Sequence, residues 1–328
     1  MVANSMNLSR RTLLGAASGL LLPDFSHAAG AEEYPARPVR MLVGLAAGGA
    51  ADVTSRLIGK WMSEHLGQSF FVENRTGAGG NIAAEEAIRA TPDGYTLLYC
   101  ASGSAINASI YHDLTFNFIR DTAPVAGMLR LPDVMLVTPS LPVKSAREFI
   151  DYARANPGKI NFASPGIGSS QHLAAELFKI MTGVEMVHVP YRGGAPATAA
   201  VLGGEVQLYF GTLTTAITGI SAGLRALAIT TKERAEILPD VPALDETVPG
   251  YDVSSWFGMS APKGTPAPII AGLNEVINAG LSDPAIKQRF AELGGIPMPM
   301  SPAEFGKFVI EDTERWSKVV RSINLTVQ

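Results

Sequence analysis

The sequence predicts an α/β fold built on doubly wound sheets of mostly parallel strands. Short apolar runs alternate along the chain with segments of helical spacing, and glycine or proline residues separate them. The runs are apolar on both faces, which is typical of strands buried inside a parallel sheet. The chain has 328 residues, which is enough for roughly two domains that each bury a core.

The elements nearest the N-terminus follow a strand–helix order. The segment 51–66 is expected to be a helix, because Val53, Leu57 and Trp61 lie four residues apart and Gly67 follows. The predicted strands of this part cover 39–44, 69–73 and 95–101, and a second helix covers 82–90.

The same alternation continues to the C-terminus. Two capping boxes, Ser145 with Glu148 and Ser301 with Glu304, each open a helix. A further helix is expected to begin at Thr265-Pro266 and to end near 281. The predicted strands of this part cover 123–129, 134–138, 159–163, 186–189, 206–210 and 225–229, with a helix at 171–181.

The composition argues against several classes of function. The formal net charge of −4 lacks the basic footprint of a nucleic-acid-binding protein. A single cysteine, Cys100, and five histidines without an i, i+4 pair do not provide the ligand clusters of a metal site. The chain also contains no Gly-Lys-Ser/Thr phosphate-binding loop. We therefore expect no metal, no cofactor and no nucleic-acid partner.

Residues 1–28 have the form of an export signal. Arg10 and Arg11 precede an apolar run at 13–22, and small residues at 26 and 28 provide a cleavage site. The paired arginines resemble a twin-arginine signal. A helix of ten residues spans about 15 Å, roughly half of a bilayer core, which favours a cleaved signal over a membrane anchor. We expect the mature chain to be periplasmic.

Two loops combine a preceding strand, small residues and a helix start, at 43–52 and 163–172. In open α/β sheets, ligands bind at this position, where helix N-terminal N–H groups favour an anion. Tight turns that bind nothing remain the alternative for each loop alone. Asp52 lies at the first loop, and we favour its role as a stabiliser of the helix start over contact with a ligand hydroxyl or amine.

An enzyme is the main alternative from another class. Ser170 and His172 lie two residues apart on one predicted helix, so their side chains do not face each other. The segment Gly166-Ile167-Gly168 begins like a dinucleotide fingerprint, but Gln171 stands where a glycine or alanine is required. We therefore expect no catalytic residues.

Short motifs follow one another along almost the whole chain after the leader. They include Ala47-Gly48-Gly49-x-x-Asp52, Pro92-Asp93-Gly94-Tyr95-Thr96-Leu97, Gly168-Ser169-Ser170-x-His172-Leu173 and Val189-Pro190-Tyr191-Arg192-Gly193. Together they resemble the Bug-type substrate-binding proteins of tripartite tricarboxylate transporters. The resemblance implies a two-lobed periplasmic binding protein of the type II-like Venus flytrap kind, in which two doubly wound sheets joined by a hinge close on a small carboxylate.

The resemblance also implies which residues hold the ligand. The family grips ligand carboxylates with loops that correspond here to 45–49 and 166–170. This chain departs from the family at Gly44-Leu45, where Pro-Phe is frequent, and at Gly211, where Asp is frequent. The predicted ligand-binding residues also include Ser102 and Asn107, because they follow the end of the predicted strand 95–101. The full set is Leu45, Ala46, Ala47, Gly48, Gly49, Asp52, Ser102, Asn107, Gly166, Gly168, Ser169, Ser170 and Gly211.

The sequence as a whole predicts a monomer whose chain crosses twice between lobes, near 131–133 and 252–254. Lobe 1 is expected to comprise 29–131 and 254–328, and lobe 2 to comprise 132–253. The expected function is to deliver a small mono-, di- or tricarboxylate to the membrane permease subunits of a tripartite transporter. A receptor that presents its ligand to a sensor remains the alternative.

Overall fold

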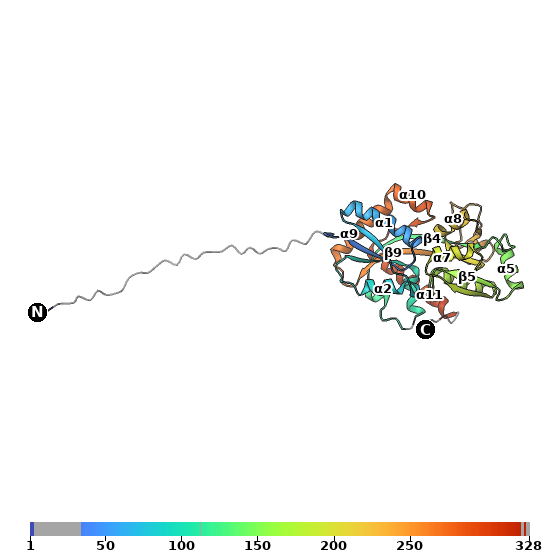
Figure 1. The fold of residues 1–328 in the computed structure, drawn as a ribbon, viewed down its shortest axis with the longest axis horizontal. Coiled ribbons are helices and arrows are strands. Elements are labelled where there is room, and N and C mark those ends of the chain that lie inside the picture. The colour runs from blue at the N-terminus through green and yellow to red at the C-terminus, as the bar shows by residue number, and fades with distance from the viewer. Residues whose placement is uncertain (3–33, 112, 323–324, 326–328) are drawn as a thin grey trace. The chain divides into compact units, whose positions relative to one another are not determined.

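The computed structural model describes residues 1–2, 34–111, 113–322 and 325. Most of the predicted export signal, 3–28, therefore lies outside the described residues. Contacts divide the chain into Met1–Glu33 and Tyr34–Gln328, and the account below concerns the second unit (Figure 1).

Ten strands form a continuous hydrogen-bonded sheet in the described residues, in the order β2-β1-β3-β9-β4-β7-β5-β6, with β8 and β10 also paired to β4. The first half contains three parallel strands and two antiparallel neighbours. Its strands are β2 (Phe70–Asn74), β1 (Val39–Val43), β3 (Thr96–Ala101), β9 (Ser254–Pro262) and β4 (Thr122–Val137).

The second half of the sheet has parallel strands at its edge. Strand β5 pairs in parallel with β6 and β7, whereas β4 lies antiparallel between β7 and β8. The strands are β5 (Ile160–Ser164), β6 (Met186–Pro190), β7 (Leu208–Thr212) and β8 (Arg225–Ile229), and the short β10 (Ile296–Pro297) joins β4 in the first half. The predicted α/β class is thereby confirmed, with the two halves of the sheet joined through β4.

Strand β4 differs from the prediction, which placed two separate strands at 123–129 and 134–138. The structure has one strand of 16 residues. Pro132 is paired with Ser254 of β9, and Asp133 is paired with Thr212 of β7, so the strand exchanges its neighbour between these residues. A proline donates no ladder hydrogen bond, and this position tolerates it because one partner strand ends there.

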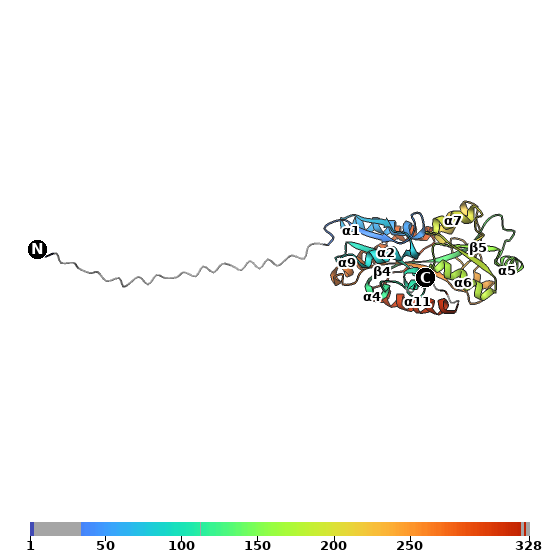
Figure 2. The same cartoon turned by 60° about the horizontal axis from the view of Figure 1, so that its bottom comes forward.

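Helices cover both faces of each half of the sheet. Figure 2 shows α1 and α7 on one side of the strands and α11 on the other. The helices are α1 (Ala50–Leu66), α2 (Asn81–Ile88), α3 (Ser102–Ile106), α4 (Phe118–Asp121), α5 (Ala146–Ala155), α6 (Ser170–Thr182), α7 (Gly194–Leu202), α8 (Leu213–Ser221), α9 (Ala267–Ser282), α10 (Pro284–Glu292) and α11 (Pro302–Ser322).

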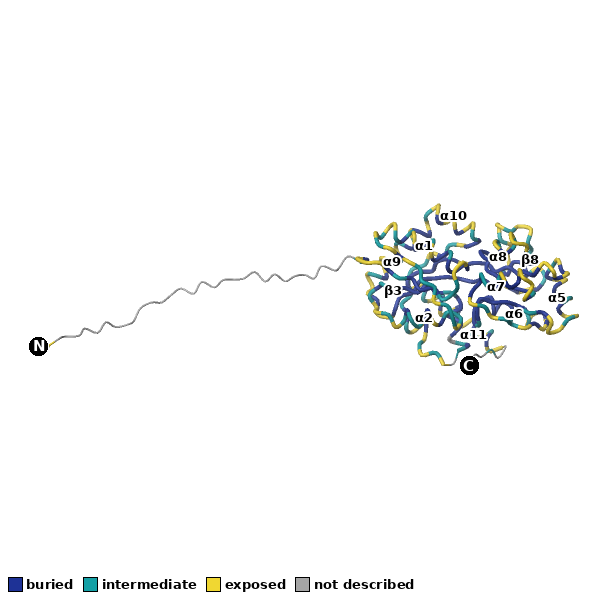
Figure 3. The backbone as a smooth tube through the Cα atoms, in the orientation of Figure 1, coloured by how far each residue is buried: buried dark blue, intermediate teal, exposed yellow. Residues whose placement is uncertain are grey.

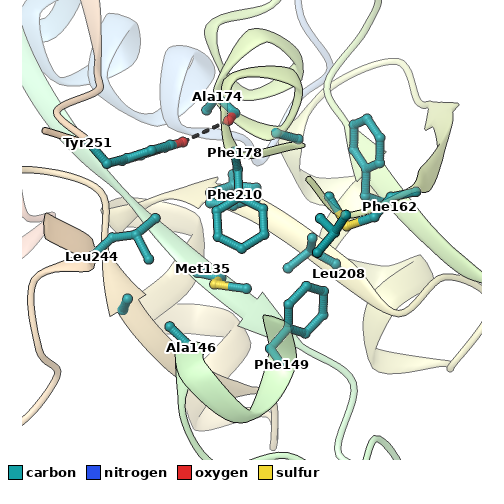
Figure 4. Close-up of a cluster of buried hydrophobic side chains, with 14 of the residues drawn as sticks. Met135, Ala146, Phe149, Phe162, Ala174, Phe178, Leu208, Phe210, Leu244 and Tyr251 are labelled. Carbon is teal, nitrogen blue, oxygen red and sulfur yellow. Dashed lines mark hydrogen bonds between the residues drawn. The ribbon is translucent and has the colours of Figure 1, made fainter. Parts of the chain in front are cut away.

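The core follows the alternation of side chains along the strands. Phe210 of β7 packs into a cluster with Phe149 and Phe178, where Tyr251 donates a hydrogen bond to the carbonyl oxygen of Ala174 at 2.7 Å (Figure 4). The neighbouring Tyr209 faces the opposite side of the sheet, under α7 and α8. Buried residues line the central strands, whereas exposed ones lie on the outer helix faces and on the edge strands β2 and β6 (Figure 3).

None of the helices in the described part of the chain combines the length and the apolarity that a bilayer-spanning segment needs. Within the same residues, no group of three or more His, Cys, Asp or Glu side chains is arranged to hold a metal ion.

Candidate ligand-binding site

Two adjoining cavities lie at the carboxyl ends of β1, β3, β5 and β7. The inner cavity has a volume of about 50 Å³ and the outer one about 240 Å³. Gly44, Leu45, Gly79, Gly80 and Pro165 line both. This is the position at which open α/β sheets bind their ligands.

Helix N-termini converge on the inner cavity. Its lining includes the first residues of α1 and α6, together with Gly194 at the start of α7 and Thr212 before α8. Each of these four helices has at least nine residues. The unpaired N–H groups and the dipole of a helix N-terminus attract an anion. None of the described residues that line the inner cavity is charged, so neutral donors dominate this site.

The β1–α1 loop contributes only part of its predicted residues to the cavity. Leu45 and Gly49 line the inner cavity, whereas Ala46, Ala47 and Gly48 line neither. The Ala46 N–H donates to the carbonyl oxygen of Arg192 at 3.0 Å, which fixes the loop against the start of α7.

Asp52 lies behind this loop and lines neither cavity. Its carboxylate accepts hydrogen bonds from the Gly48 N–H at 3.0 Å and from the Arg56 Nε at 3.0 Å. Burial raises the pKa of Asp52, but the bonds from Arg56 and Gly48 outweigh burial and hold that pKa below its ordinary value. These contacts fit a role for Asp52 in stabilising the start of α1. They also engage the Gly48 N–H, which is then not free to bind a ligand.

The β5–α6 loop places Ser169 and Ser170 in the lining of the inner cavity, and Gly166 in that of the outer cavity. Ser169 is the N-cap of α6: its Oγ accepts from the His172 N–H at 3.2 Å and donates to the Gly166 carbonyl at 2.7 Å. The Ser169 hydroxyl proton is therefore engaged within the loop. Ser170 instead contacts Ser255 Oγ at 2.9 Å.

Gly168 packs against the chain and lines neither cavity. Its φ of +81° lies in the left-handed region, and a Cβ there would overlap Asn107 Oδ1. Asn107 also lines neither cavity, and its Nδ2 donates to Asn81 Oδ1 at 2.7 Å and to the Gly79 carbonyl at 3.2 Å. Both residues therefore hold the surrounding loops together.

The remaining predicted residues are Ser102 and Gly211. Ser102 lines the inner cavity at the end of β3. Gly211 is buried and lines neither cavity, but a Cβ on it would come within 2.6 Å of the Tyr209 ring. The absence of a side chain at Gly211 thus leaves room for Tyr209.

The structure adds lining residues that the sequence prediction did not include. Tyr209 is fully buried, and its hydroxyl has no hydrogen-bond partner within the described part of the chain. Gly211 was predicted from the resemblance to the family, and Thr212, the next residue, ends the same strand. Nothing in the sequence marks Ser255, because it reaches the cavity from a strand that was not predicted. The added residues include Gln171, Tyr209, Thr212, Thr215, Ser255 and Phe257.

The histidines near α6 are packed against each other, with His172 buried and His188 half-buried. His172 and His188 stack with ring centroids 3.8 Å apart. Burial lowers the pKa of His172 to about 2 and that of His188 to about 4, so both rings are neutral at physiological pH. Ser164 Oγ lies 2.6 Å from His188 Nε2, but Ser164 is fully buried and lines neither cavity.

Comparisons with known proteins identify related sequences and structures. A family model described as "Tripartite tricarboxylate transporter family receptor" matches residues 54–325. Protein BugT of Bordetella pertussis is 36% identical over 295 residues, which cover 89% of this chain and 90% of BugT.

Two solved structures resemble the chain over nearly its whole length. R. palustris Rpa4515 with adipate is 37% identical, with a TM-score of 0.88 over 90% of this chain and 100% of that one. MatC from Rhodopseudomonas palustris with bound malate is 32% identical, with a TM-score of 0.83 over 88% of this chain and 100% of MatC.

Proposed function

The chain belongs to the family of tripartite tricarboxylate transporter receptors, and we propose that it is a periplasmic solute-binding protein that holds a small carboxylate between two lobes. The observation that carries the proposal is the convergence of four helix N-termini on an inner cavity whose described lining has no charged side chain. Such a site favours an anion and offers no carboxylate partner to a cation.

The proposed lobes are 29–131 with 254–328 and 132–253, and β4 carries the chain between them. Lining residues come from both: Leu45, Gly49 and Ser102 from the first, and Ser170 and Thr212 from the second. A ligand in contact with both sets stabilises the closed arrangement, because it binds that arrangement more tightly than an open one.

Among the predicted site residues, we assign direct ligand contact to those that line the inner cavity. They are Leu45, Gly49, Ser102 and Ser170, joined by Tyr209 and Thr212. Ser169 also lines the cavity, but its hydroxyl is bonded within the loop, so we assign it no ligand contact. Ala46, Ala47, Gly48, Asp52, Asn107, Gly166, Gly168 and Gly211 shape and support the loops around them.

Neutral donors are sufficient for useful affinity. Hydrogen bonds to a charged group contribute about 1.5–3 kcal/mol each. Four or five of them, reduced by the cost of ordering and closure, correspond to roughly micromolar binding, about −8 kcal/mol. The relatives solved with adipate and malate make dicarboxylates the first ligands to test.

The decisive experiment is thermal unfolding followed by calorimetry with adipate, malate and the dimethyl esters of both acids. The acids should raise the unfolding temperature, whereas the uncharged esters should not. At a free acid concentration of 100 times the Kd, the free energy of unfolding should increase by about 2.7 kcal/mol. Absence of binding by any mono-, di- or tricarboxylate would refute the proposal. Recovery of chemically unchanged ligand would distinguish binding from turnover.

Delivery to membrane permease subunits is part of the proposal, because the family is named for tripartite transporters. Uptake of the bound carboxylate should require both this protein and the permease. If uptake continues without the protein while a transcriptional response to the ligand disappears, the chain serves a sensor instead.

A further inference from the structure

Asp133 is a fully buried carboxyl group at the point where β4 exchanges β9 for β7. Its Oδ1 accepts from Ser255 Oγ at 2.9 Å and from Gln171 Nε2 at 3.3 Å. Its backbone is bonded to Thr230, whose Oγ1 accepts from the Asp133 N–H at 2.9 Å. These contacts bring together β9, α6 and the end of β8.

None of the described residues that contact this carboxyl group carries a positive charge. The titratable groups that respond to its charge are the phenols of Tyr209 and Tyr251, whose pKa values are raised first by their own burial and then by Asp133. Arg130 is exposed and bonds Ser254 Oγ instead. Burial raises the pKa of Asp133 to about 7, although the bonds from Ser255 and Gln171 act in the opposite direction.

A chain of hydroxyl groups links Asp133 to the ligand cavity. Ser255 Oγ lies 2.9 Å from Ser170 Oγ, and both serines line the inner cavity. Gln171 Nε2 donates to Ser255 Oγ at 2.7 Å. Each serine hydroxyl has one proton to donate. The direction of each hydrogen bond along these hydroxyl groups therefore fixes the direction of the neighbouring one.

When Asp133 is ionised, it accepts only, and Ser255 must donate its single proton to it. Ser255 then accepts from Gln171 and from Ser170. The Ser170 proton points away from the cavity, which receives only lone pairs from this hydroxyl. A ligand carboxylate placed there meets an acceptor rather than a donor.

When Asp133 is protonated, the chain reverses. The carboxyl O–H donates to Ser255, and Ser255 donates to Ser170. The Ser170 proton is then released from Ser255, and a ligand in the cavity competes for it with Gln171 Oε1, which lies 3.3 Å from Ser170 Oγ. The Gln171 bond to Ser255 is retained, because the Ser255 oxygen accepts two bonds. Every polar atom in the chain stays satisfied, and Ser170 gains a donor directed at the ligand.

We propose that Asp133 is a positioning residue whose protonation turns the Ser170 hydroxyl toward the bound carboxylate, so that ligand capture takes up a proton from solvent. This inference rests on the proposed function, because it requires an anionic ligand in the inner cavity. It also predicts that carboxylate affinity declines as pH rises, although the carboxylate ligand itself remains ionised.

Calorimetry with adipate and with malate tests the proposal at pH 6 and pH 8, in pairs of buffers of different ionisation enthalpy. With Asp133 titrating near pH 7, affinity should fall about tenfold between the two pH values. Proton uptake on binding should approach one at pH 8 and decline toward zero at pH 6.

Three variants separate the hydroxyl chain from other effects. Asp133→Asn replaces the titrating carboxyl group with a neutral amide, so binding should become independent of pH and take up no proton. Ser255→Ala keeps the buried carboxyl but cuts the chain, so the pH dependence should disappear. Asp312→Asn alters a buried carboxylate that accepts from Trp256 Nε1 at 2.7 Å outside the cavities, and it should retain the wild-type dependence.

The outcomes distinguish the two proposals. Binding with equal affinity at both pH values and no proton uptake overturns the role of Asp133 and leaves the proposed function intact. A pH dependence that persists in Ser255→Ala also overturns it, because simple repulsion by the Asp133 charge would then explain the effect. Failure of every carboxylate to bind at either pH removes both proposals.

Discussion

The starts of α1 and α6 present helix N-termini to the same cavity, but their supporting carboxyl groups have opposite environments. Asp52 behind α1 is bonded by Arg56 and by a backbone N–H, and its pKa is lowered despite burial. Asp133, linked to the start of α6, has hydroxyl and amide partners only, and its pKa is raised by burial. The α1 side therefore has a fixed charge, whereas the α6 side has one that responds to pH.

The largest difference is expected in the pH dependence of stability. Unfolded Asp133 ionises near its ordinary pKa of 3.8, whereas the folded group keeps its proton up to about pH 7. The folded state binds more protons in this interval, so the free energy of unfolding should decrease between about pH 4 and pH 7, by about 4 kcal/mol at most. Urea unfolding at several pH values should show this loss in the wild type and a flatter profile in Asp133→Asn. Parallel profiles would contradict it.

The next largest difference is expected in stability when one glycine of each loop is replaced by alanine. Gly48 has φ +79° and only Ala195 Cβ near an added Cβ, at 3.7 Å. Gly168 has a similar φ, and its Cβ would also overlap Asn107 Oδ1. We expect Gly168→Ala to destabilise by about 2–4 kcal/mol and Gly48→Ala by about 1 kcal/mol. If chemical denaturation gives the same loss of unfolding free energy for both variants, Asn107 moves aside freely and this prediction is wrong.

Alanine substitution of the two serines at the start of α6 should affect different properties of the protein. Ser170→Ala removes a hydroxyl with access to the ligand and should weaken carboxylate binding about five- to a hundredfold at pH 6. Ser169→Ala removes an N-cap and should lower stability by about 1 kcal/mol with little change in affinity. Paired calorimetry and melting curves distinguish them, and the reverse pattern would assign the ligand contact to Ser169.

The smallest effect is expected at Asp52. Asp52→Asn removes the charge at the first turn of α1 and its ion pair with Arg56, and should cost about 0.5–1 kcal/mol at neutral pH. The pKa of folded Asp52 is lowered, so its contribution is present above the ordinary carboxyl range and disappears as pH falls below it. The wild type and the variant should therefore converge in stability in acid. A constant difference at all pH values would contradict this interpretation.

The local pattern of apolar and punctuating residues was sufficient to predict most elements of the fold. The predicted helix 51–66 is α1 within one residue, and the strand 225–229 is β8. Strand β9 was not predicted, because Ser254–Pro262 mixes serine, glycine and aromatic residues without alternation, and all nine residues are buried. A strand in the middle of a sheet can be buried on both faces without being uniformly apolar.

The candidate site was predictable only where local sequence carries the signal. Strand-end loops identified Leu45, Ser102, Ser169 and Ser170 as residues near a ligand, and the structure places all four in the cavity lining. Asp133 and Ser255 are separated by 122 positions along the chain. Only the pairing of β4 with β9 brings them together, and no local pattern encodes that contact.

The neutral lining of the inner cavity has a consequence for kinetics and ionic strength. The chain carries a formal net charge of −4, and the donors of the cavity act through short-range dipoles rather than full charges. An incoming dianion therefore meets net repulsion at long range, which Arg192 in the lining of the outer cavity offsets locally, and the dipoles of the inner cavity attract it only after contact. Added salt shortens the range of that repulsion. Association with a dicarboxylate should consequently become faster as salt is added, whereas a site built from lysines and arginines would lose its electrostatic steering.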